Sequence, residues 1–148
     1  MRILVQAEPF DQAAEIAAFG QDHDNVGAVV TFTGIVRNSD AGDLTCMQIE
    51  HYPGMTEKAL TQIAEQAQSR WELNDVLVIH RHGELRPGDQ IMMVATAARH
   101  RRAAFEAADF LMDYLKSRAP FWKKEITATG DTWVAQNAQD EDALARWR

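Results

Sequence analysis

The segment LKSRAPFWKKE, residues 115–125, concentrates positive charge in a chain whose formal net charge is −7. Lys123 and Lys124 directly follow two large aromatic side chains, Phe121 and Trp122. If one of these rings walls a pocket around a lysine amine, the lost hydration lowers the pKa of the amine and makes it a usable nucleophile or proton shuttle near neutral pH. Two lysines can divide those tasks. The alternative interpretation is an exposed lysine pair on an edge strand.

A second basic cluster lies at residues 99–102, where a long helix is predicted to begin, and it contains Arg99, His100, Arg101 and Arg102. Free N–H groups and the helix dipole favour an anion at this end, whereas positive side chains here are unfavourable for the helix itself. A phosphate site and a solvated basic turn neutralised by nearby acids both remain open. At the other end of the same helix, Lys116 and Arg118 suit the negative end of the dipole and have a structural explanation.

Arg37 ends a predicted strand and precedes a polar loop, where it can clamp a phosphate or carboxylate or form a surface ion pair. His80 and His82 are two residues apart on a predicted strand, so their rings share a face and could hold a metal, but no third ligand stands beside them and we predict no metal site. Cys46, the single cysteine, cannot form an internal disulfide and is predicted to be a buried core residue.

These residues need elements to position them, and the apolar spacing predicts both helices and strands. We predict helices over residues 10–19, 55–71 and 100–118, the last being the longest, with Thr56 available as the N-cap of the second. Pro53-Gly54 predicts a turn before it. Strands are predicted over 27–37, interrupted at Gly34, and over 44–52, 76–82, 90–97, 121–127 and a short stretch near Trp133. Strands that pair before helices indicate an α+β fold with a mixed or antiparallel sheet.

The totals indicate one soluble globular domain over residues 1–148, with 46% apolar and 25% charged residues. The tail from about residue 138 is predicted to be helical or flexible. No apolar run is long enough to cross a bilayer, and the N-terminus is unlike a secretory signal, so we expect a cytoplasmic protein without membrane contact. A pI near 5.1 argues against nucleic-acid binding, although a local basic pocket for a small anion is compatible with it.

Five segments in this order resemble the catalytic large subunit of molybdopterin synthase; they are VVTFTGIVRN, EHYPGMTEKAL, VIHRHGELRPGD, HRRAAFEAADFLMDYLKSRAPFWKKE and GDTWV. The resemblance runs from about residue 27 to residue 134. It implies an α/β-hammerhead fold and a homodimer within a heterotetramer. It also implies a small ubiquitin-like partner subunit whose C-terminal Gly-Gly thiocarboxylate delivers sulfur to cyclic pyranopterin monophosphate, with no cofactor of its own.

By this resemblance, Lys116 and Lys123 match the catalytic lysines, and Arg37, His100 and Arg101 match residues that line the anionic substrate pocket. We expect Lys123, flanked by aromatic side chains, to have the lower pKa and Lys116 the electrostatic role. We also expect both ends of the long helix to face one shared cavity. Phe32 and Met112 fall in the matching motifs but are predicted to be core residues.

The chain departs from the family pattern at Asn137, where the resemblance leads us to expect an arginine that reaches the neighbouring pocket of the dimer. Arg146 or Arg148 can substitute for it, or the anion is held without it. Two other classes of function stay open beside the sulfur-transfer enzyme. One is a noncatalytic module that docks a ubiquitin-like tail or a phosphorylated ligand, and the other is a metal enzyme that uses His80 and His82.

Overall fold

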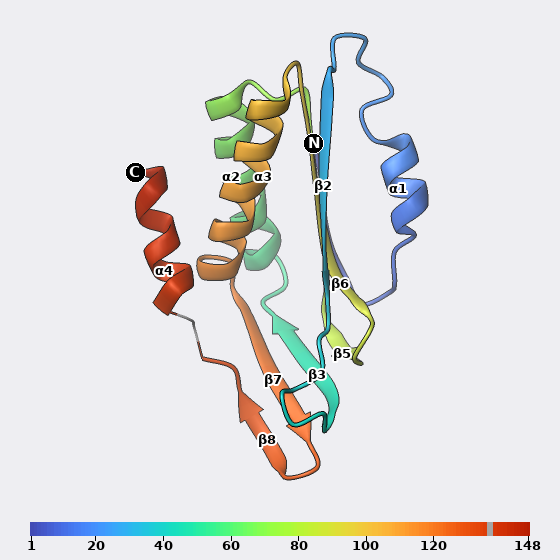
Figure 1. The fold of residues 1–148 in the computed structure, drawn as a ribbon, viewed down its shortest axis with the longest axis vertical. Coiled ribbons are helices and arrows are strands. Elements are labelled where there is room, and N and C mark those ends of the chain that lie inside the picture. The colour runs from blue at the N-terminus through green and yellow to red at the C-terminus, as the bar shows by residue number, and fades with distance from the viewer. Residues whose placement is uncertain (136–137) are drawn as a thin grey trace.

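The computed structural model describes residues 1–135 and 138–148. It contains two sheets, and the larger one has both parallel and antiparallel strand pairs (Figure 1). In order across this sheet lie β1 (Arg2–Gln6), β4 (Asp75–Arg81), β6 (Gln90–Ala98) and β2 (Ala28–Ile35). β1 and β4 are parallel, while β6 is antiparallel to both β4 and β2. β2 therefore forms one edge of the sheet.

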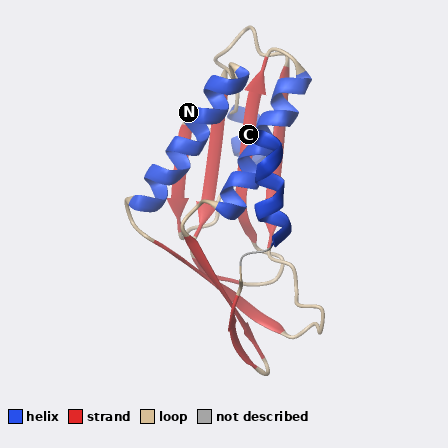
Figure 2. Cartoon of the chain, turned by 90° about the vertical axis from the view of Figure 1, so that its left-hand side faces the viewer, coloured by secondary structure: helices blue, strands red, loops and turns tan. Residues whose placement is uncertain are grey.

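The smaller sheet is antiparallel throughout and contains β5 (Gly83–Leu85), β3 (Leu44–His51), β7 (Phe121–Thr127) and β8 (Gly130–Trp133) in this order. Figure 2 shows that it extends beyond the helices that cover the larger sheet. Mixed helix and strand content with two sheets confirms the predicted α+β class and its mixed and antiparallel pairing.

Helices cover both faces of the larger sheet. α2 (Met55–Trp71) and α3 (Arg101–Ser117) pack on one face, and the short α1 (Gln12–Ala18) lies on the other (Figure 1). Alternation along a strand sends successive side chains to opposite faces, so Val76 and Val78 join the core under α2 and α3 while Leu77 and Ile79 join the core under α1. The prediction that α3 is the longest helix is wrong, because α2 also has 17 residues.

The predicted turn at Pro53-Gly54 is present, but Thr56 is not the N-cap of α2. Gly54 occupies the cap with a φ of 84°, a left-handed value that glycine adopts without strain. Thr56 lies within the first turn and is completely buried. If Thr56 were the N-cap, α2 would begin at residue 57, but it begins at Met55. The Thr56 hydroxyl therefore bonds to other segments of the chain.

The C-terminal residues follow the helical alternative for the tail. α4 (Ala138–Leu144) is followed by a 3-10 turn, η1 (Ala145–Trp147). The Trp147 ring lies 5.6 Å from the centroids of both Trp71 and Phe110, and its indole N–H donates to Asp113 on α3. Among the described residues, none of the helices has the length and apolarity needed to cross a membrane.

Two residues, Met112 and Phe32, were predicted to belong to the core, and the prediction for Phe32 is wrong in the single chain. Met112 is partly buried against the core under α2 and α3, whereas Phe32 is 42% exposed. Phe32 belongs to β2, which has no neighbouring strand on its outer side, so the edge position leaves its ring accessible. Cys46 is buried in β3 as a free thiol, and burial raises its pKa.

Candidate active site

The two candidate catalytic lysines lie on either side of one tight turn. Lys116 is exposed in the last turn of α3, and Lys123 is the third residue of β7 and is partly buried. Burial, the main cause, lowers the pKa of Lys123, and the positive charge of Lys116 lowers it further. Asp140 of α4 acts in the opposite direction. The site therefore holds a partly dehydrated amine next to a second cation.

Strand alternation decides which aromatic ring accompanies Lys123. Phe121 and Lys123 are two residues apart on β7 and share a face, while Trp122 points to the other side. Trp122 is 41% exposed and meets the Tyr52 ring edge to face at 4.4 Å. Phe121 stacks instead on the buried ring of His80, with centroids 3.8 Å apart. Phe121, and not Trp122, is the aromatic neighbour of the Lys123 side chain.

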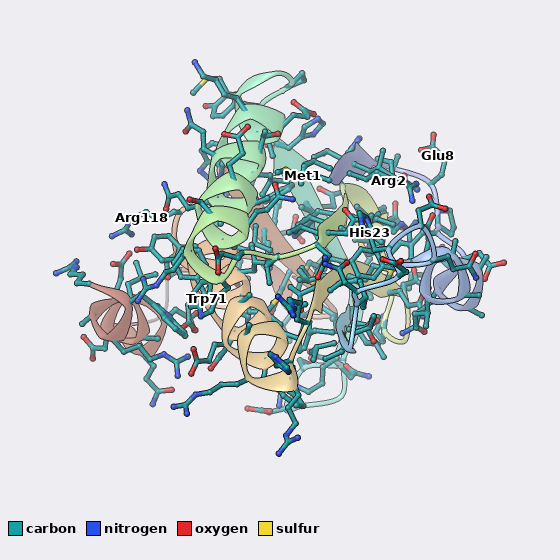
Figure 3. The ribbon with its side chains drawn as sticks, turned by 90° about the horizontal axis from the view of Figure 1, so that it is seen from above. Met1, Arg2, Glu8, His23, Trp71 and Arg118 are labelled. Atoms are coloured by element: carbon teal, nitrogen blue, oxygen red, sulfur yellow. The ribbon has the colours of Figure 1, made fainter. Side chains whose placement is uncertain are left out.

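The other two basic residues of this segment have acidic partners. The Arg118 guanidinium lies 2.6 Å from a carboxylate oxygen of Glu141, on α4. In Figure 3, Arg118 and Trp71 lie on the side of the molecule that carries α2, α3 and α4, away from Glu8 and His23. Lys124 lies 3.6 Å from Asp131 and 5.5 Å from the centroid of the Trp133 ring. Both have structural partners, which leaves Lys116 and Lys123 as the candidate pair for chemistry.

The second basic cluster lies at the start of α3. No side chain caps this helix end, and its first turn contains no acid. Arg102 pairs with Glu106 at 3.0 Å. His100 and Arg101 are exposed and, among the described residues, have no acidic partner, and they line an open cleft together with Gly27. Uncapped N–H groups beside cations without an acidic partner are the arrangement that the sequence predicts for an anion site, and binding of an anion here stays a prediction.

The expectation of one shared cavity is wrong for a single chain. An α-helix rises about 1.5 Å per residue, so Arg101 and Lys116 are about 22 Å apart along α3. Arg37 follows β2, which runs in the same direction as α3 because both are antiparallel to β6 (Figure 1). Arg37 is therefore near the end of α3 that carries Lys116, while His100 and Arg101 lie at the opposite end.

The two histidines of the possible metal site, His80 and His82, stack on different rings. His80 stacks on Phe121, while His82 stacks on His51 with centroids 4.0 Å apart. The described residues contain no group of three or more His, Cys, Asp or Glu side chains that could hold a metal. The Nδ1–H of His80 donates to the carbonyl oxygen of Arg81 at 2.8 Å, and burial lowers the pKa of His80 to about 3. His80 is a neutral, fixed ring next to Lys123.

The sequence did not reveal that three residues lie around the lysine pair. Thr56 bonds to Pro120, His80 stacks on Phe121, and Asp140 acts on the charge of Lys123. Each lies far from residues 116–123 in the sequence or belongs to another element. For Asp140 no pattern in the sequence signals the contact. The signal available for Thr56 was a hydroxyl residue at the start of a predicted helix, which also fits an N-cap.

Fold and site together define an α+β protein with a candidate lysine pair at one end of α3 and a candidate anion site at the other. Residues 5–118 match the family described as MoaE protein. A molybdopterin synthase catalytic subunit from Cereibacter sphaeroides is 63% identical over 99% of this chain and 100% of its own length. The MoaE structure from Burkholderia ambifaria has a TM-score of 0.84 at 51% identity, covering 99% of this chain and 97% of the other.

A third comparison concerns the fold alone. A complex of subunits 1 and 2 of molybdopterin-converting factor from Helicobacter pylori contains a chain with a TM-score of 0.77 at 18% identity, with 91% of both chains covered. The chain described here belongs to the MoaE family. In enzyme class it is a molybdopterin synthase catalytic subunit, a transferase component of molybdenum cofactor biosynthesis.

Proposed function

We propose that Lys123 and Lys116 transfer sulfur from the C-terminal thiocarboxylate of a small ubiquitin-like subunit to cyclic pyranopterin monophosphate, and that two transfers make the dithiolene of molybdopterin. The observation that carries this assignment is the position of Lys123, which is partly buried on β7 near the Lys116 cation; burial and that cation lower its pKa. An amine with a lowered pKa loses its proton at a pH where an ordinary lysine is fully charged. It then acts as a base, an acid or a transient covalent partner.

Lys116 has the electrostatic role in this proposal. It is an exposed cation in the last turn of α3, where in this proposal a thiocarboxylate tail brings a negative charge. A fixed cation near developing negative charge stabilises it without reorganisation during the reaction. Arg37, at the same end of α3, provides a second cation for the same anionic guests.

The phosphate of the substrate binds, in this proposal, at the start of α3 through His100, Arg101 and the uncapped N–H groups. About 22 Å separate this cluster from Lys116 within a chain. One substrate cannot span both ends, so the complete site requires a second copy of the chain.

A symmetric dimer through the β2 edge meets this requirement. β2 exposes three apolar side chains, Val29, Phe32 and Ile35, at 43%, 42% and 55%. In a two-fold arrangement the two β2 strands pair antiparallel, so the start of one strand lies beside the end of the other. Gly27 and the 99–101 segment adjoin the start of β2, whereas Arg37 adjoins its end. His100 and Arg101 of one copy then approach Arg37, Lys116 and Lys123 of the other.

The small partner subunit is supported by what relatives assemble with. The Helicobacter pylori structure is described as a complex of two subunits of the molybdopterin-converting factor. We propose that this chain likewise binds a small second subunit, and that two copies of each form a heterotetramer around the chain's own homodimer. Position 137, where the resemblance leads us to expect an arginine, lies outside the described residues. Arg146, one suggested substitute, is held on its own chain by Asp109 and Asp113. The cytoplasmic location remains a prediction.

Substitution of single lysines tests the proposal. The protein is incubated with a thiocarboxylated small subunit and the pterin precursor, and the dithiolene product is measured by fluorescence after oxidation. Lys123→Arg keeps the charge but cannot transfer a proton near neutral pH, so we expect kcat to fall at least about a hundredfold. Lys116→Arg keeps the electrostatic role, and the loss should be under about tenfold.

Lys124→Arg is the matched control, because Lys124 is paired with Asp131 and should tolerate the change. Equal activity of Lys123→Arg and the parent would remove the assignment of Lys123. A parent that binds the partner tail without forming any product would support the alternative, a noncatalytic docking module.

A further inference from the structure

The turn between the two lysines is held by residues outside the segment. Only six residues separate Lys116 from Lys123, and they run from the last turn of α3 through Pro120 into β7. The backbone N–H of Arg118 donates to the carbonyl of Tyr114 at 2.7 Å, and that of Phe121 donates to the carbonyl of Ala119 at 2.8 Å. The conformation of this turn sets the distance between the two amines.

Thr56 of α2 contacts this turn from a position 64 residues earlier in the chain. Its hydroxyl donates to the carbonyl oxygen of Pro120 at 3.1 Å and accepts from the backbone N–H of Tyr52 at 3.0 Å. The side chain is completely buried, and both capacities of the hydroxyl are used between two backbone groups. A single hydroxyl thus joins the end of β3, the start of α2 and the lysine turn.

His80 holds the next residue of the same turn. Its ring is 5% exposed and stacks on Phe121 with an interplanar angle of 18°. His80 belongs to β4, so the stack limits how the start of β7, which carries Phe121 and Lys123, can shift relative to β4. Thr56 and His80 therefore restrain the turn at two successive residues, Pro120 and Phe121.

We propose that Thr56 is a positioning residue for the lysine pair, acting through the carbonyl of Pro120 to hold Lys123 close to Lys116 and away from water. This inference rests on the proposed function of the two lysines. The groups that face Lys123 are Lys116 from α3, Asp140 from α4 and His80 from β4, with Glu125 on the same face of β7. If the turn loosens, the two amines separate and water reaches Lys123.

Thr56→Val tests this role, since valine has nearly the same shape but no hydroxyl. The first measurement needs no substrate and follows the pH dependence of Lys123 acetylation by acetic anhydride, read by mass spectrometry. We expect the midpoint for Lys123 to move upward by at least about half a pH unit, toward the ordinary lysine value. In the sulfur-transfer assay, kcat should fall at least about tenfold while KM for the pterin changes less than about twofold.

Two further variants separate positioning from general destabilisation. Thr56→Ser retains the hydroxyl and should restore the parent midpoint and kcat. Thr61→Val makes the same chemical change in the same helix, where the hydroxyl donates to the carbonyl of Glu57, and should leave the Lys123 midpoint unchanged. If Thr56→Val does not fold, Thr56→Cys, whose thiol is a weak donor, takes its place with the same expectations.

A Thr56→Val protein with the Lys123 midpoint and kcat of the parent overturns the proposal. So does a change of midpoint that Thr61→Val produces equally. The acetylation measurement reports on Lys123 whether or not the protein transfers sulfur. A midpoint that shifts as expected in a protein whose parent forms no product would leave the positioning role standing and count against the proposed function alone.

Discussion

At the scale of single residues, the candidate site depends on the different surroundings of two adjacent lysines, Lys123 and Lys124. Lys123 and Lys124 are adjacent, yet burial lowers the pKa of Lys123 while Lys124 pairs with Asp131 on the opposite face. The difference follows from strand alternation, which sends one side chain toward Phe121 and the other toward Trp133. Two identical side chains thereby have different chemistry.

His80 gives a residue-scale prediction about stability. Its pKa is lowered to about 3 in the folded protein, while an unfolded histidine titrates near 6.5. Below about pH 6.5 the unfolded chain takes up a proton at His80 that the folded protein does not. The free energy of unfolding should therefore decrease between pH 6.5 and 3, by up to about 1.4 kcal/mol per pH unit from this group.

Urea unfolding at several pH values in this range, with parent and His80→Phe, measures the effect. Phenylalanine retains a ring that stacks on Phe121 but does not titrate, so the variant should show a weaker dependence on pH. Its absolute stability is expected to change as well, because the carbonyl of Arg81 loses its donor. Equal pH dependence in the two proteins would contradict the assignment.

At the scale of elements, the position of α3 depends on a close approach of two backbone segments. The N–H of Gly27 donates to the carbonyl of Ala98 at 2.9 Å, and a Cβ added at Gly27 would lie 2.1 Å from the carbonyl oxygen of Arg99. The atom it would meet belongs to the backbone and cannot rotate away. Gly27 thus permits the connection from β6 to α3 that presents His100 and Arg101.

Gly27→Ala is expected to lower stability by about 1–3 kcal/mol and to weaken binding of the phosphorylated substrate, because the 99–101 segment must shift. Thermal unfolding followed by circular dichroism measures the first effect, and KM for the pterin measures the second. Gly34→Ala is the control within β2. Its Cβ would meet the flexible side chain of Met92 at 3.4 Å, so both quantities should change little. Equal effects of the two substitutions would argue against a special role of Gly27.

At the scale of the whole molecule, the two basic clusters lie at opposite ends of α3, and the proposed dimer unites them. This arrangement predicts complementation between inactive variants. Arg101→Ala and Lys123→Arg damage different chains of each shared site. When the two proteins are unfolded together and refolded as a mixture, half of the dimers are mixed, and each mixed dimer has one intact site.

We expect the refolded mixture to recover about a quarter of the parent activity, while each variant alone stays near its low value. A mixture of Lys116→Ala and Lys123→Arg is the control and should recover nothing, because both residues belong to the same half of the site. If the Arg101→Ala and Lys123→Arg mixture also recovers nothing, the shared site is excluded.

Local spacing predicted most of the elements. The 3.6-residue period of apolar side chains marked α2 and α3, and β-branched segments marked the strands to within a few residues. Motif resemblance predicted the family, and the order of strands and helices predicted the α+β class; the comparisons and the fold confirm both. The bounds of α2 were predicted correctly, but its N-cap was not, because Thr56 and Gly54 both fit a helix start.

The sequence by itself determined most of the elements, the family and the two basic clusters, because these depend on residues close together along the chain; β1 and β5 were not predicted. Only the tertiary structure decided that Phe121 rather than Trp122 accompanies Lys123, that Thr56 bonds to Pro120, and that His100 lies far from Lys116 in one chain. These are contacts between segments distant in sequence. They depend on how strands pair and helices pack, which local periodicity does not specify.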